Sequence, residues 1–324
     1  MVHAIRIHKT GGPEVLQWEE VEVGKPGQGE VRIRHTAVGL NYVDTYLRGG
    51  VYPLPLPSGL GGEGAGAVEE VGPGVADLKV GDRVAYGAAP QGAYSQARLV
   101  PADRLVKLPD GISDQVAAAM MLKGMTTEYL VNRSYDIKPG DTVLYHAAAG
   151  GVGLIFGQWA KAKGATVIGT AGGAEKVKLA RDHGYDHVID YSKEDFVARV
   201  GEITKGAKCA AVYDGVGKDT FMKSLDCVRP HGIVVSFGQS SGKSAPVDLV
   251  VLSTKGSLYV QRPTLATYAA KRADLVAMAK NLFDMVLSGK VRIAVGQTYP
   301  LKDAAKAHAD LEARRTTGST VFVV

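Results

Sequence analysis

The chain has 324 residues, of which 45% are hydrophobic and 22% are charged. A chain of this length and composition can bury a substantial core, and about 150 residues per domain predicts two domains. No stretch approaches the roughly 18 uninterrupted apolar residues of a membrane span, and the first residues mix charge with apolar positions. The composition excludes a disordered or membrane-embedded protein, and we expect an unexported, cytoplasmic one.

Cysteine content and charge narrow the class further. Cys209 and Cys227 are the two cysteines, too few for a disulfide framework, which favours a reducing compartment. The formal net charge of +5 is small for the length, and the basic residues are scattered rather than clustered. This balance suits an anionic small molecule better than nucleic acid.

Two patterns divide the chain. From residue 1 to about 120, short alternating apolar runs such as 4–7 and 30–38 are separated by Gly and Pro clusters, which predicts a mostly β domain with long loops. After about residue 125, strand and helix patterns alternate, which predicts an α/β domain with a doubly wound parallel sheet. The expected strands are 142–148, 165–170, 187–191, 209–217 and 232–238, and the expected helices are 152–164, 174–184 and 193–206.

The last part of the chain changes pattern again. Residues from about 268 to 312 contain helical patterns, and a β-branched run at 319–324 predicts a strand that returns to the first domain. We therefore expect one domain at 1–124 and 266–324, and a second at 125–265.

A glycine-rich loop is the strongest functional signal. A literal G-x-G-x-x-G at Gly59, Gly61 and Gly64 follows a Pro-rich loop and does not join a strand to a helix, so its context is wrong. The run from Ala148 to Gly153, an A-x-G-x-x-G variant, lies between an expected strand and helix. Its glycines allow a tight turn and close approach to a pyrophosphate at a helix N-terminus. This predicts dinucleotide binding.

The next strand indicates which dinucleotide binds. An NAD site usually places an acid about 20 residues after the loop, but none occurs between Gly153 and Glu175. The second strand ends at Thr170 in a small-residue turn followed by Lys176, a cation for a 2′-phosphate. We therefore expect NADPH rather than NADH, although Lys176 alone is equally compatible with a solvated helix residue.

Several segments together carry a family resemblance. The runs Val38–Val75 and Val80–Tyr86, with LKGMTTEYL, HAAAGGVG, YDGVG and FGQSSG, resemble the medium-chain dehydrogenases and reductases. The sequence is most similar to the zinc-free bacterial quinone oxidoreductases, relatives of zeta-crystallin. The resemblance implies a Rossmann NADP-binding domain and a GroES-like, mostly β catalytic domain. It also implies no metal site, because Gly61-Gly62-Glu63 replaces the Gly-His-Glu of zinc alcohol dehydrogenases and no Cys ligand occurs near Gly39 to Asn41.

The resemblance also implies a set of cofactor-binding residues, to which the glycine loop and the second strand add Gly153 and Thr170. The set is Asn41, Lys123, Thr126, Gly150, Gly151, Val152, Gly153, Thr170, Lys176, Tyr191, Phe237, Ser240, Arg262 and Arg314. Arg314 would join Lys176 and Tyr191 around the 2′-phosphate. The alternatives are a surface lysine at a helix start for Lys123, and a solvated helix end for Arg314 and Arg315.

Aromatic and polar residues crowd the region between residues 41 and 52, which we expect to be rich in loops. They are Asn41, Tyr42, Asp44, Tyr46, Arg48 and Tyr52. Ring faces and hydrogen-bond donors could line a flat, electron-poor substrate, and we select Asn41, Tyr46 and Tyr52 as catalytic residues. The alternative is that the tyrosines pack as ordinary core or surface residues.

The expected function is zinc-independent transfer of hydride or single electrons from NADPH to a quinone. The alternatives are an NADPH-dependent reductase of alkenal or enone double bonds, and an RNA-binding or structural zeta-crystallin-like protein. We expect a homodimer formed through an edge strand at Gly256–Val260.

Overall fold

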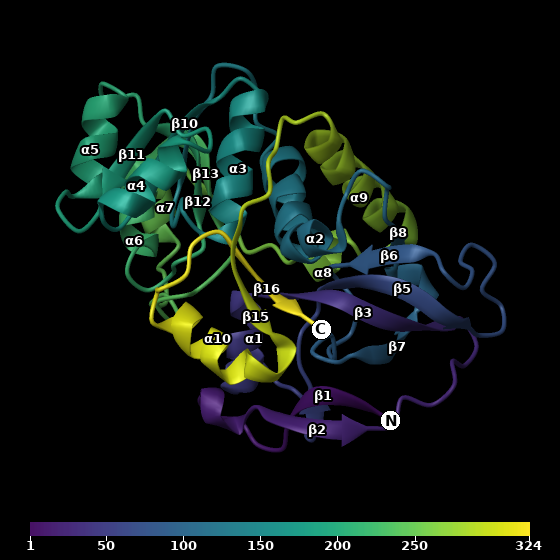
Figure 1. Cartoon of the computed structure of the whole chain (residues 1–324). Coiled ribbons are helices and arrows are strands. Elements are labelled where there is room, and N and C mark those ends of the chain that lie inside the picture. The colour runs from purple at the N-terminus through teal and green to yellow at the C-terminus, as the bar shows by residue number, and fades with distance from the viewer. The chain divides into compact units, whose positions relative to one another are not determined.

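The computed structural model describes residues 1–324 and divides into two units, followed along the chain by colour in Figure 1. The first unit comprises residues 1–125, 269–287 and 293–324, and the second comprises residues 126–268 and 288–292. The domain boundaries expected from the sequence, between residues 124 and 125 and between residues 265 and 266, stay a prediction. No helix of the chain combines the length and the apolar character needed to cross a membrane.

The first unit is built on a seven-stranded sheet with the order β15-β16-β3-β5-β6-β8, in which β7 also pairs with β3. A second sheet has the order β2-β1-β4. The strands are β1 (Val2–Ile7), β2 (Gln17–Val21), β3 (Glu30–Leu40), β4 (Ser58–Gly59), β5 (Gly64–Val71), β6 (Arg83–Tyr86), β7 (Ala97–Pro101), β8 (Val106–Lys107), β15 (Val295–Pro300) and β16 (Ser319–Val323). The mostly β character expected for residues 1–120 is confirmed.

The C-terminal strand closes this sheet. β16 pairs antiparallel with β3, with Thr320 opposite Leu40 and Val323 opposite Ala37. The expected return of the last strand to the first part of the chain is therefore confirmed. Its other neighbour, β15, was not expected, because its residues alternate between half-buried and exposed and include Gly and Pro, which leaves little apolar signal.

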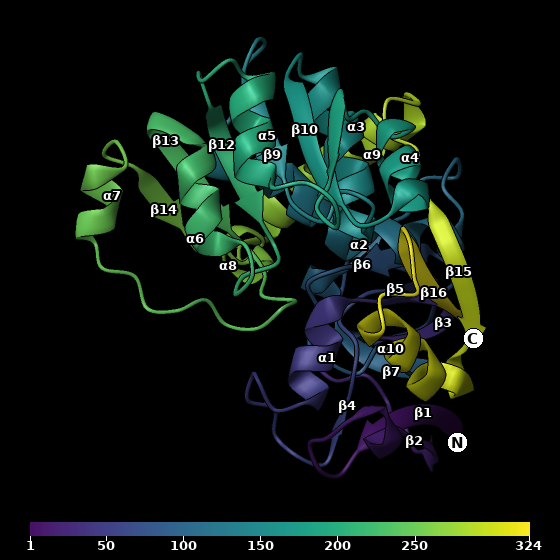
Figure 2. The ribbon, with the colours of Figure 1, turned by 90° about the vertical axis from the view of Figure 1, so that its left-hand side faces the viewer.

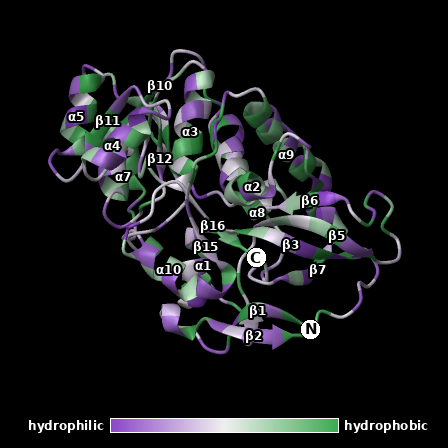
Figure 3. Cartoon of the chain, in the orientation of Figure 1, coloured by the Kyte–Doolittle hydropathy of each residue, from purple (hydrophilic) through white to green (hydrophobic).

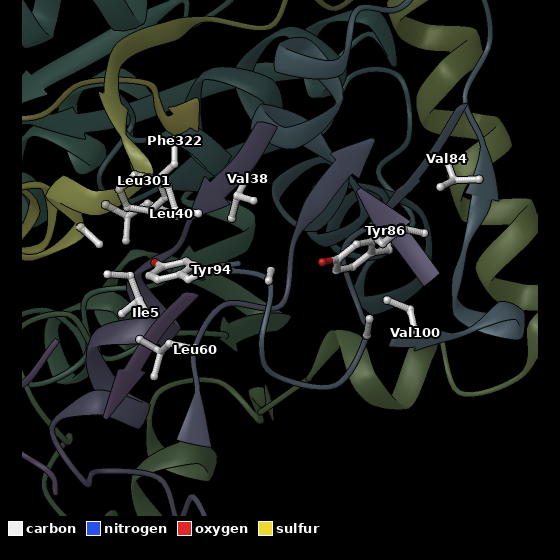
Figure 4. Packing of buried hydrophobic residues seen from close by; sticks show 14 of the residues in the cluster. Ile5, Val38, Leu40, Leu60, Val84, Tyr86, Tyr94, Val100, Leu301 and Phe322 are labelled. Carbon is white, nitrogen blue, oxygen red and sulfur yellow. The ribbon is translucent and has the colours of Figure 1, made fainter. Parts of the chain in front are cut away.

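The helices of the first unit are α1 (Tyr42–Arg48), α9 (Arg272–Leu287), α10 (Ala304–Glu312) and the larger part of α2 (Asp114–Tyr129). In Figure 3, α10 shows both hydrophilic and hydrophobic residues, as a helix with one face on a core does. The core of the first unit gathers residues distant in sequence, including Ile5, Leu60, Tyr94 and Phe322 (Figure 4). The rings of Tyr94 and Phe322 meet edge to face at 4.9 Å.

The second unit contains a six-stranded parallel sheet in the order β11-β10-β9-β12-β13-β14. Helices α3 to α6 lie against these strands (Figure 2), so the Rossmann, doubly wound α/β class is confirmed. The strands are β9 (Thr142–Tyr145), β10 (Thr166–Ala171), β11 (His187–Asp190), β12 (Cys209–Asp214), β13 (Val228–Ser236) and β14 (Tyr259–Gln261). The helices are α3 (Gly151–Ala162), α4 (Ala174–Arg181), α5 (Phe196–Ile203), α6 (Phe221–Ser224), α7 (Val250–Thr254) and α8 (Leu265–Tyr268).

The expected strands of this unit differ from the observed ones at their ends; 209–217, for example, ends at Asp214, and backbone geometry explains two of the differences. The strand expected at 142–148 ends at Tyr145, because Ala147 has a φ of 61° that an extended strand cannot contain. The edge strand expected at Gly256–Val260 begins instead at Tyr259, because Gly256 and Ser257 have φ values of 115° and 54°. Left-handed backbone thus sets both limits.

A buried histidine of the first unit generates a stability prediction. The His35 ring donates from Nδ1 to the Ser95 carbonyl (2.7 Å) and accepts at Nε2 from the Tyr86 hydroxyl (2.7 Å). The pKa of His35 is lowered to about 4, mainly by burial of the ring. The ring therefore stays neutral in the folded protein, while His35 of the unfolded chain takes up a proton below pH 6.5.

Folding stability due to His35 is therefore fully present above pH 6.5 and is lost as the pH falls toward 4. Replacing His35→Gln keeps a donor and an acceptor but removes the titration. We expect urea unfolding of the wild type to lose about 2 kcal/mol more than the variant between pH 7.5 and 5.0. Equal losses in the two proteins would contradict this account.

Candidate functional site

The glycine loop of the second unit joins β9 to α3, in the strand–turn–helix setting expected from the sequence. Gly150 is the N-cap of α3, and Gly151 is the first helical residue. The Gly59–Gly64 run, in contrast, lies between β4 and β5 with no helix after it. Of these two glycine runs, only the loop from Ala148 to Gly153 presents backbone N–H groups at the start of a helix, the arrangement that holds a phosphate.

Close backbone contacts explain the glycines of this loop. A Cβ atom on Gly153 would lie 2.5 Å from the Ala148 carbonyl oxygen and 2.7 Å from that of Ala147. Ala148 N–H donates to the Thr170 carbonyl (2.9 Å), and Gly150 N–H donates to the Ala147 carbonyl (3.0 Å). The loop is therefore tight and is tied to the end of β10.

The hydroxyl of Thr170 lies in a buried polar chain beneath this loop. His146 Nδ1 is 3.0 Å from Thr170 Oγ1, and His146 Nε2 is 3.0 Å from Ser224 Oγ. Ser224 in turn donates to Asp214 (2.8 Å), and burial lowers the pKa of His146. The structure thus places the Thr170 side chain inside the unit, where it supports the loop through His146.

A second corner, at the end of β10, brings Tyr191 beside the turn at Gly172 and Gly173. A Cβ on Gly172 would lie 2.7 Å from the Tyr191 hydroxyl, and Tyr191 N–H donates to the Ala171 carbonyl (3.1 Å). Lys176 lies on the first turn of α4, which begins directly after Gly173. The two residues expected at a 2′-phosphate therefore flank the same turn, and 48% of Tyr191 remains exposed.

An acid that the sequence analysis did not select also lies at this corner. Asp190 ends β11, and its carboxylate accepts the Gly173 N–H (3.1 Å) and the Ser192 hydroxyl (2.6 Å). The hydrogen bond from Ser192 is the largest cause that lowers the pKa of Asp190. Asp190 therefore uses its charge to hold the turn.

The remaining expected residues of the second unit gather after β13 and β14. The Arg262 guanidinium donates to the Ser236 carbonyl (2.8 Å), Phe237 packs on Gly215, and Ser240 N–H donates to the Gly215 carbonyl (3.2 Å). Thr126 and Arg262 both affect the pKa of Tyr129. Burial most strongly raises the pKa of Tyr129, while the charge of Arg262 and a hydrogen bond from Thr126 lower it.

In the first unit, residues 42–48 of the crowded region form helix α1 rather than a loop, and Tyr52 lies after this helix. Asn41 is the N-cap of α1, and the rings of Tyr42, Tyr46 and Tyr52 meet edge to face at 5.3 and 5.4 Å. The loop expectation was wrong because the Asn41–Asp44 capping box, spaced like a helix start, was not recognised. Asp44 and Arg48 are buried, so their side chains are not exposed beside the tyrosines.

Glu63 is the functional candidate that the sequence analysis missed. This fully buried carboxylate accepts from Asn41 Nδ2 (2.7 Å), from Lys123 Nζ (3.0 Å) and from the Leu122 backbone N–H (2.8 Å). Lys123 lies within α2 and is only 6% exposed, so it is not a surface lysine at a helix start. An acid set in the small-residue run around residues 61–66 was the available signal of a buried charge with a partner.

The Glu63 carboxylate occupies the space that a cysteine ligand at residue 39 would need. A Cβ on Gly39 would lie 2.1 Å from Glu63 Oε2 and 2.2 Å from the Ala118 carbonyl oxygen, so no cysteine fits at residue 39 without rearrangement. No group of three or more His, Cys, Asp or Glu side chains is arranged to hold a metal ion.

Arg314 lies in the exposed turn after α10, with a φ of 59°. Burial is the largest cause that raises the pKa of Tyr42, and the charge of Arg314 is one of the causes that lower it. The charge of Arg314 therefore acts on Tyr42. Arg315 pairs with Asp310 instead.

The expected site residues thus form two groups, one in each unit. Asn41 and Lys123 share Glu63, Tyr46 contacts both Tyr42 and Tyr52, and the charge of Arg314 acts on Tyr42. The second unit holds Thr126, Gly150, Gly151, Val152, Gly153, Thr170, Lys176, Tyr191, Phe237, Ser240 and Arg262. Their roles in binding and catalysis stay predictions.

Family models match both units. Residues 27–110 match an alcohol dehydrogenase GroES-like domain, and residues 151–281 match a zinc-binding dehydrogenase domain. A GroES-like domain combined with a Rossmann domain defines the medium-chain dehydrogenases and reductases.

Similar proteins specify the branch. A quinone oxidoreductase of Pseudomonas aeruginosa is 54% identical over the whole of both chains. A 2-haloacrylate reductase of a Burkholderia species is 48% identical, covering 100% of this chain and 99% of its own. The crystal structure of an Escherichia coli quinone oxidoreductase complexed with NADPH has a TM-score of 0.98 and 49% identity, covering 99% of this chain and 100% of its own. The chain therefore belongs to the quinone oxidoreductase family, which confirms the resemblance.

The tight loop yields a prediction for Gly153→Ala. The added Cβ would push against the carbonyl groups of Ala147 and Ala148, so the loop must open. We expect the variant to unfold at a lower temperature and to bind NADPH at least tenfold more weakly, measured by thermal unfolding and fluorescence titration.

The matched control is Gly201→Ala, in α5, where a Cβ meets nothing within 4 Å. Alanine should stabilise this helix slightly and leave NADPH binding unchanged. Wild-type NADPH affinity in Gly153→Ala would overturn the role given to the loop.

Proposed function

We propose that the protein is an NADPH:quinone oxidoreductase, which reduces a quinone or another conjugated carbonyl with electrons from NADPH. The observation that carries the proposal is the pairing of the Ala148–Gly153 loop with the corner formed by Tyr191, Lys176 and the Gly172 turn. The loop suits the pyrophosphate, and the corner suits a 2′-phosphate. The family membership of the chain supports the same activity.

The residues fit this cofactor on local grounds. Gly153 leaves no room for a side chain against the backbone of the loop, and the N–H groups of Gly151 and Val152 belong to the first turn of α3. Lys176 supplies a positive charge, and Tyr191 supplies a half-exposed hydroxyl. When bound, NADPH supplies the hydride, and the protein contributes orientation, shielding and hydrogen bonds.

Three adjacent tyrosines, Tyr42 and Tyr46 of α1 and Tyr52 after it, suit a flat substrate. Tyr46 lies between Tyr42 and Tyr52, in edge-to-face contact with both, which presents aromatic surface suited to a ring or a conjugated chain. Asn41 begins the same helix, and Glu63 fixes the orientation of its side-chain amide. In this proposal, Asn41, Tyr46 and Tyr52 position the substrate and hydrogen-bond its carbonyl oxygen.

The reaction proposed here is independent of zinc. Zinc alcohol dehydrogenases use a His where this chain has Gly62 and a Cys near Gly39, and the space at Gly39 belongs to Glu63. A quinone is electrophilic without a Lewis acid, so the chemistry does not require a metal.

A second candidate activity is reduction of an activated carbon–carbon double bond. The 48% identity to a 2-haloacrylate reductase over the whole chain favours it. The same hydride and the same loop would serve both reactions. Turnover with NADPH on a simple benzoquinone and on an α,β-unsaturated ketone or acid decides between them, because the substrate with the larger kcat/KM identifies the reaction. The RNA-binding alternative stays a prediction.

Cofactor preference is tested at Lys176. We expect wild-type protein to bind NADPH at least tenfold more tightly than NADH, and Lys176→Ala to lose most of that difference by losing NADPH affinity alone. Fluorescence titration with both cofactors measures it.

Lys178→Ala is the matched control, because Lys178 lies on the same helix, is highly exposed and pairs with Asp182 (2.6 Å). It should keep the preference. Equal affinity of the wild type for NADPH and NADH would remove the basis for assigning NADPH.

We further propose a homodimer formed through β14. This strand pairs only with β13, so its other edge is open, and apolar residues on it and on α7 are exposed. Tyr259 is 64% exposed, Leu249 is 76% exposed and Val250 is 61% exposed. A second copy pairing across a two-fold axis would cover both the edge and these side chains.

Light scattering tests the dimer. The wild type should have twice the chain mass of 34.1 kDa, and Tyr259→Arg should shift the protein toward the monomer. The control Val276→Arg changes an exposed apolar residue of α9 and should leave the dimer intact. A wild-type mass of one chain would refute the proposal.

A further inference from the structure

A buried chain of hydrogen bonds runs behind Asn41 in the first unit. The Asp44 carboxylate accepts the backbone N–H of Asn41 (2.9 Å) and the Tyr94 hydroxyl (2.9 Å) at the same oxygen, Oδ2. Tyr94 is 3.0 Å from His308 Nε2, and His308 Nδ1 is 2.9 Å from Arg48 Nη1. These residues come from α1, from the segment between β6 and β7, and from α10.

The direction of every bond in this chain is fixed by Arg48. A guanidinium can only donate, so His308 Nδ1 must accept and the ring hydrogen must sit on Nε2. His308 therefore donates to the Tyr94 oxygen, which leaves the Tyr94 hydrogen for Asp44. The chain thus always presents a donor to the Asp44 carboxylate.

His308 keeps this direction over the working range of pH. Burial first, and then the charge of Arg48, lower the pKa of His308 to about 3, so the ring stays neutral. Arg48 is itself held by the Gly11 carbonyl (3.1 Å) and by Glu312 (2.7 Å). Figure 4 shows the ring of Tyr94 lying among core residues such as Ile5 and Leu60, where it has little freedom to turn.

The other oxygen of Asp44 lacks a partner. Oδ1 is buried and accepts no hydrogen bond, and the whole side chain is fully buried. A proton on this carboxyl group would have no acceptor at Oδ1 and would weaken Oδ2 as an acceptor for the Asn41 N–H. The hold on Asn41 therefore depends on whether Asp44 is ionised.

We propose that Asp44 is a positioning residue for the reaction, which holds Asn41 through its backbone N–H and does so fully only as a carboxylate. This inference rests on the proposed function, in which Asn41 positions the substrate and hydrogen-bonds its carbonyl oxygen. Glu63 holds the side chain of Asn41 and Asp44 holds its backbone, so two buried carboxylates fix one residue.

The surroundings of Asp44 place its ionisation near neutral pH. Burial is the largest cause and raises the pKa of Asp44 to about 7, against the lowering effects of the Asn41 N–H and the Tyr94 hydroxyl. The charge of Lys123, on α2, lowers it further and that of Glu63, before β5, raises it. The carboxylate is present above pH 7 and is lost below it, so kcat/KM should fall as the pH falls through about 7.

The test is the pH profile of quinone reduction in Tyr94→Phe. Loss of the hydroxyl removes a hydrogen bond that lowers the pKa of Asp44, so the acid limb of kcat/KM should move to higher pH. The matched control is Tyr86→Phe, which also breaks a buried Tyr–His hydrogen bond, to His35 (2.7 Å), without touching Asp44. It should lose stability and leave the limb in place.

A second variant, Asp44→Asn, should lower kcat/KM for the quinone about tenfold and abolish the acid limb. An unmoved limb in Tyr94→Phe, or an equal shift in Tyr86→Phe, would overturn the proposal. So would an Asp44→Asn profile that keeps the wild-type limb.

Infrared spectroscopy of the wild type keeps the test decisive if the variants do not fold. A buried carboxyl band should appear as the pH falls through about 7, and no such band would overturn the proposal. This readout needs no turnover. A protein that binds no NADPH and reduces neither quinone nor enone would instead overturn the proposed function.

Discussion

The buried carboxylate of Glu63 is the interaction on which the first unit's functional residues depend. It joins the N-cap of α1, the middle of α2 and the backbone beside β5 through hydrogen bonds of 2.7 to 3.0 Å. A charge taken out of water is tolerated only when donors surround it, so these elements cannot separate without a large cost in free energy. Lys123 balances the charge, and Gly39 leaves the space. The orientation of the Asn41 side chain follows from Glu63, while Asp44 holds the Asn41 backbone.

In the second unit, the expected site residues are held by close backbone packing rather than by a buried charge. Its loop after β9 needs close packing of carbonyl groups against Gly153, and its corner after β10 needs the Tyr191 ring against Gly172. Both requirements exclude side chains at specific positions. The neutral His146 beneath the loop connects the ends of β9, β10 and β12 through Thr170 and Ser224, which makes the loop a rigid part of the sheet.

Much of this could be predicted from the sequence, because alternating strand and helix patterns and a glycine loop are local signals. The Rossmann sheet and the return of residues 319–323 to the first sheet were both inferred in this way. β15 was missed, because a half-exposed strand carries little apolar pattern. Glu63 and the chain from Asp44 through Tyr94 to His308 were missed for another reason. Their partners lie 22 to 214 residues apart, and a single sequence does not report such contacts.

The pairing of β16 with β3 has a consequence for the order in which the chain can fold during synthesis. The parallel sheet uses residues 142–261, so all its strands have been made before residues 262–323 are made. The seven-stranded sheet of the first unit starts at residue 30 but cannot be completed until residue 323 has been made. Until then residues 37–40 of β3, which neither β5 nor β7 covers on that side, lack their partner strand β16. The seven-stranded sheet is therefore begun before the parallel sheet and completed after it.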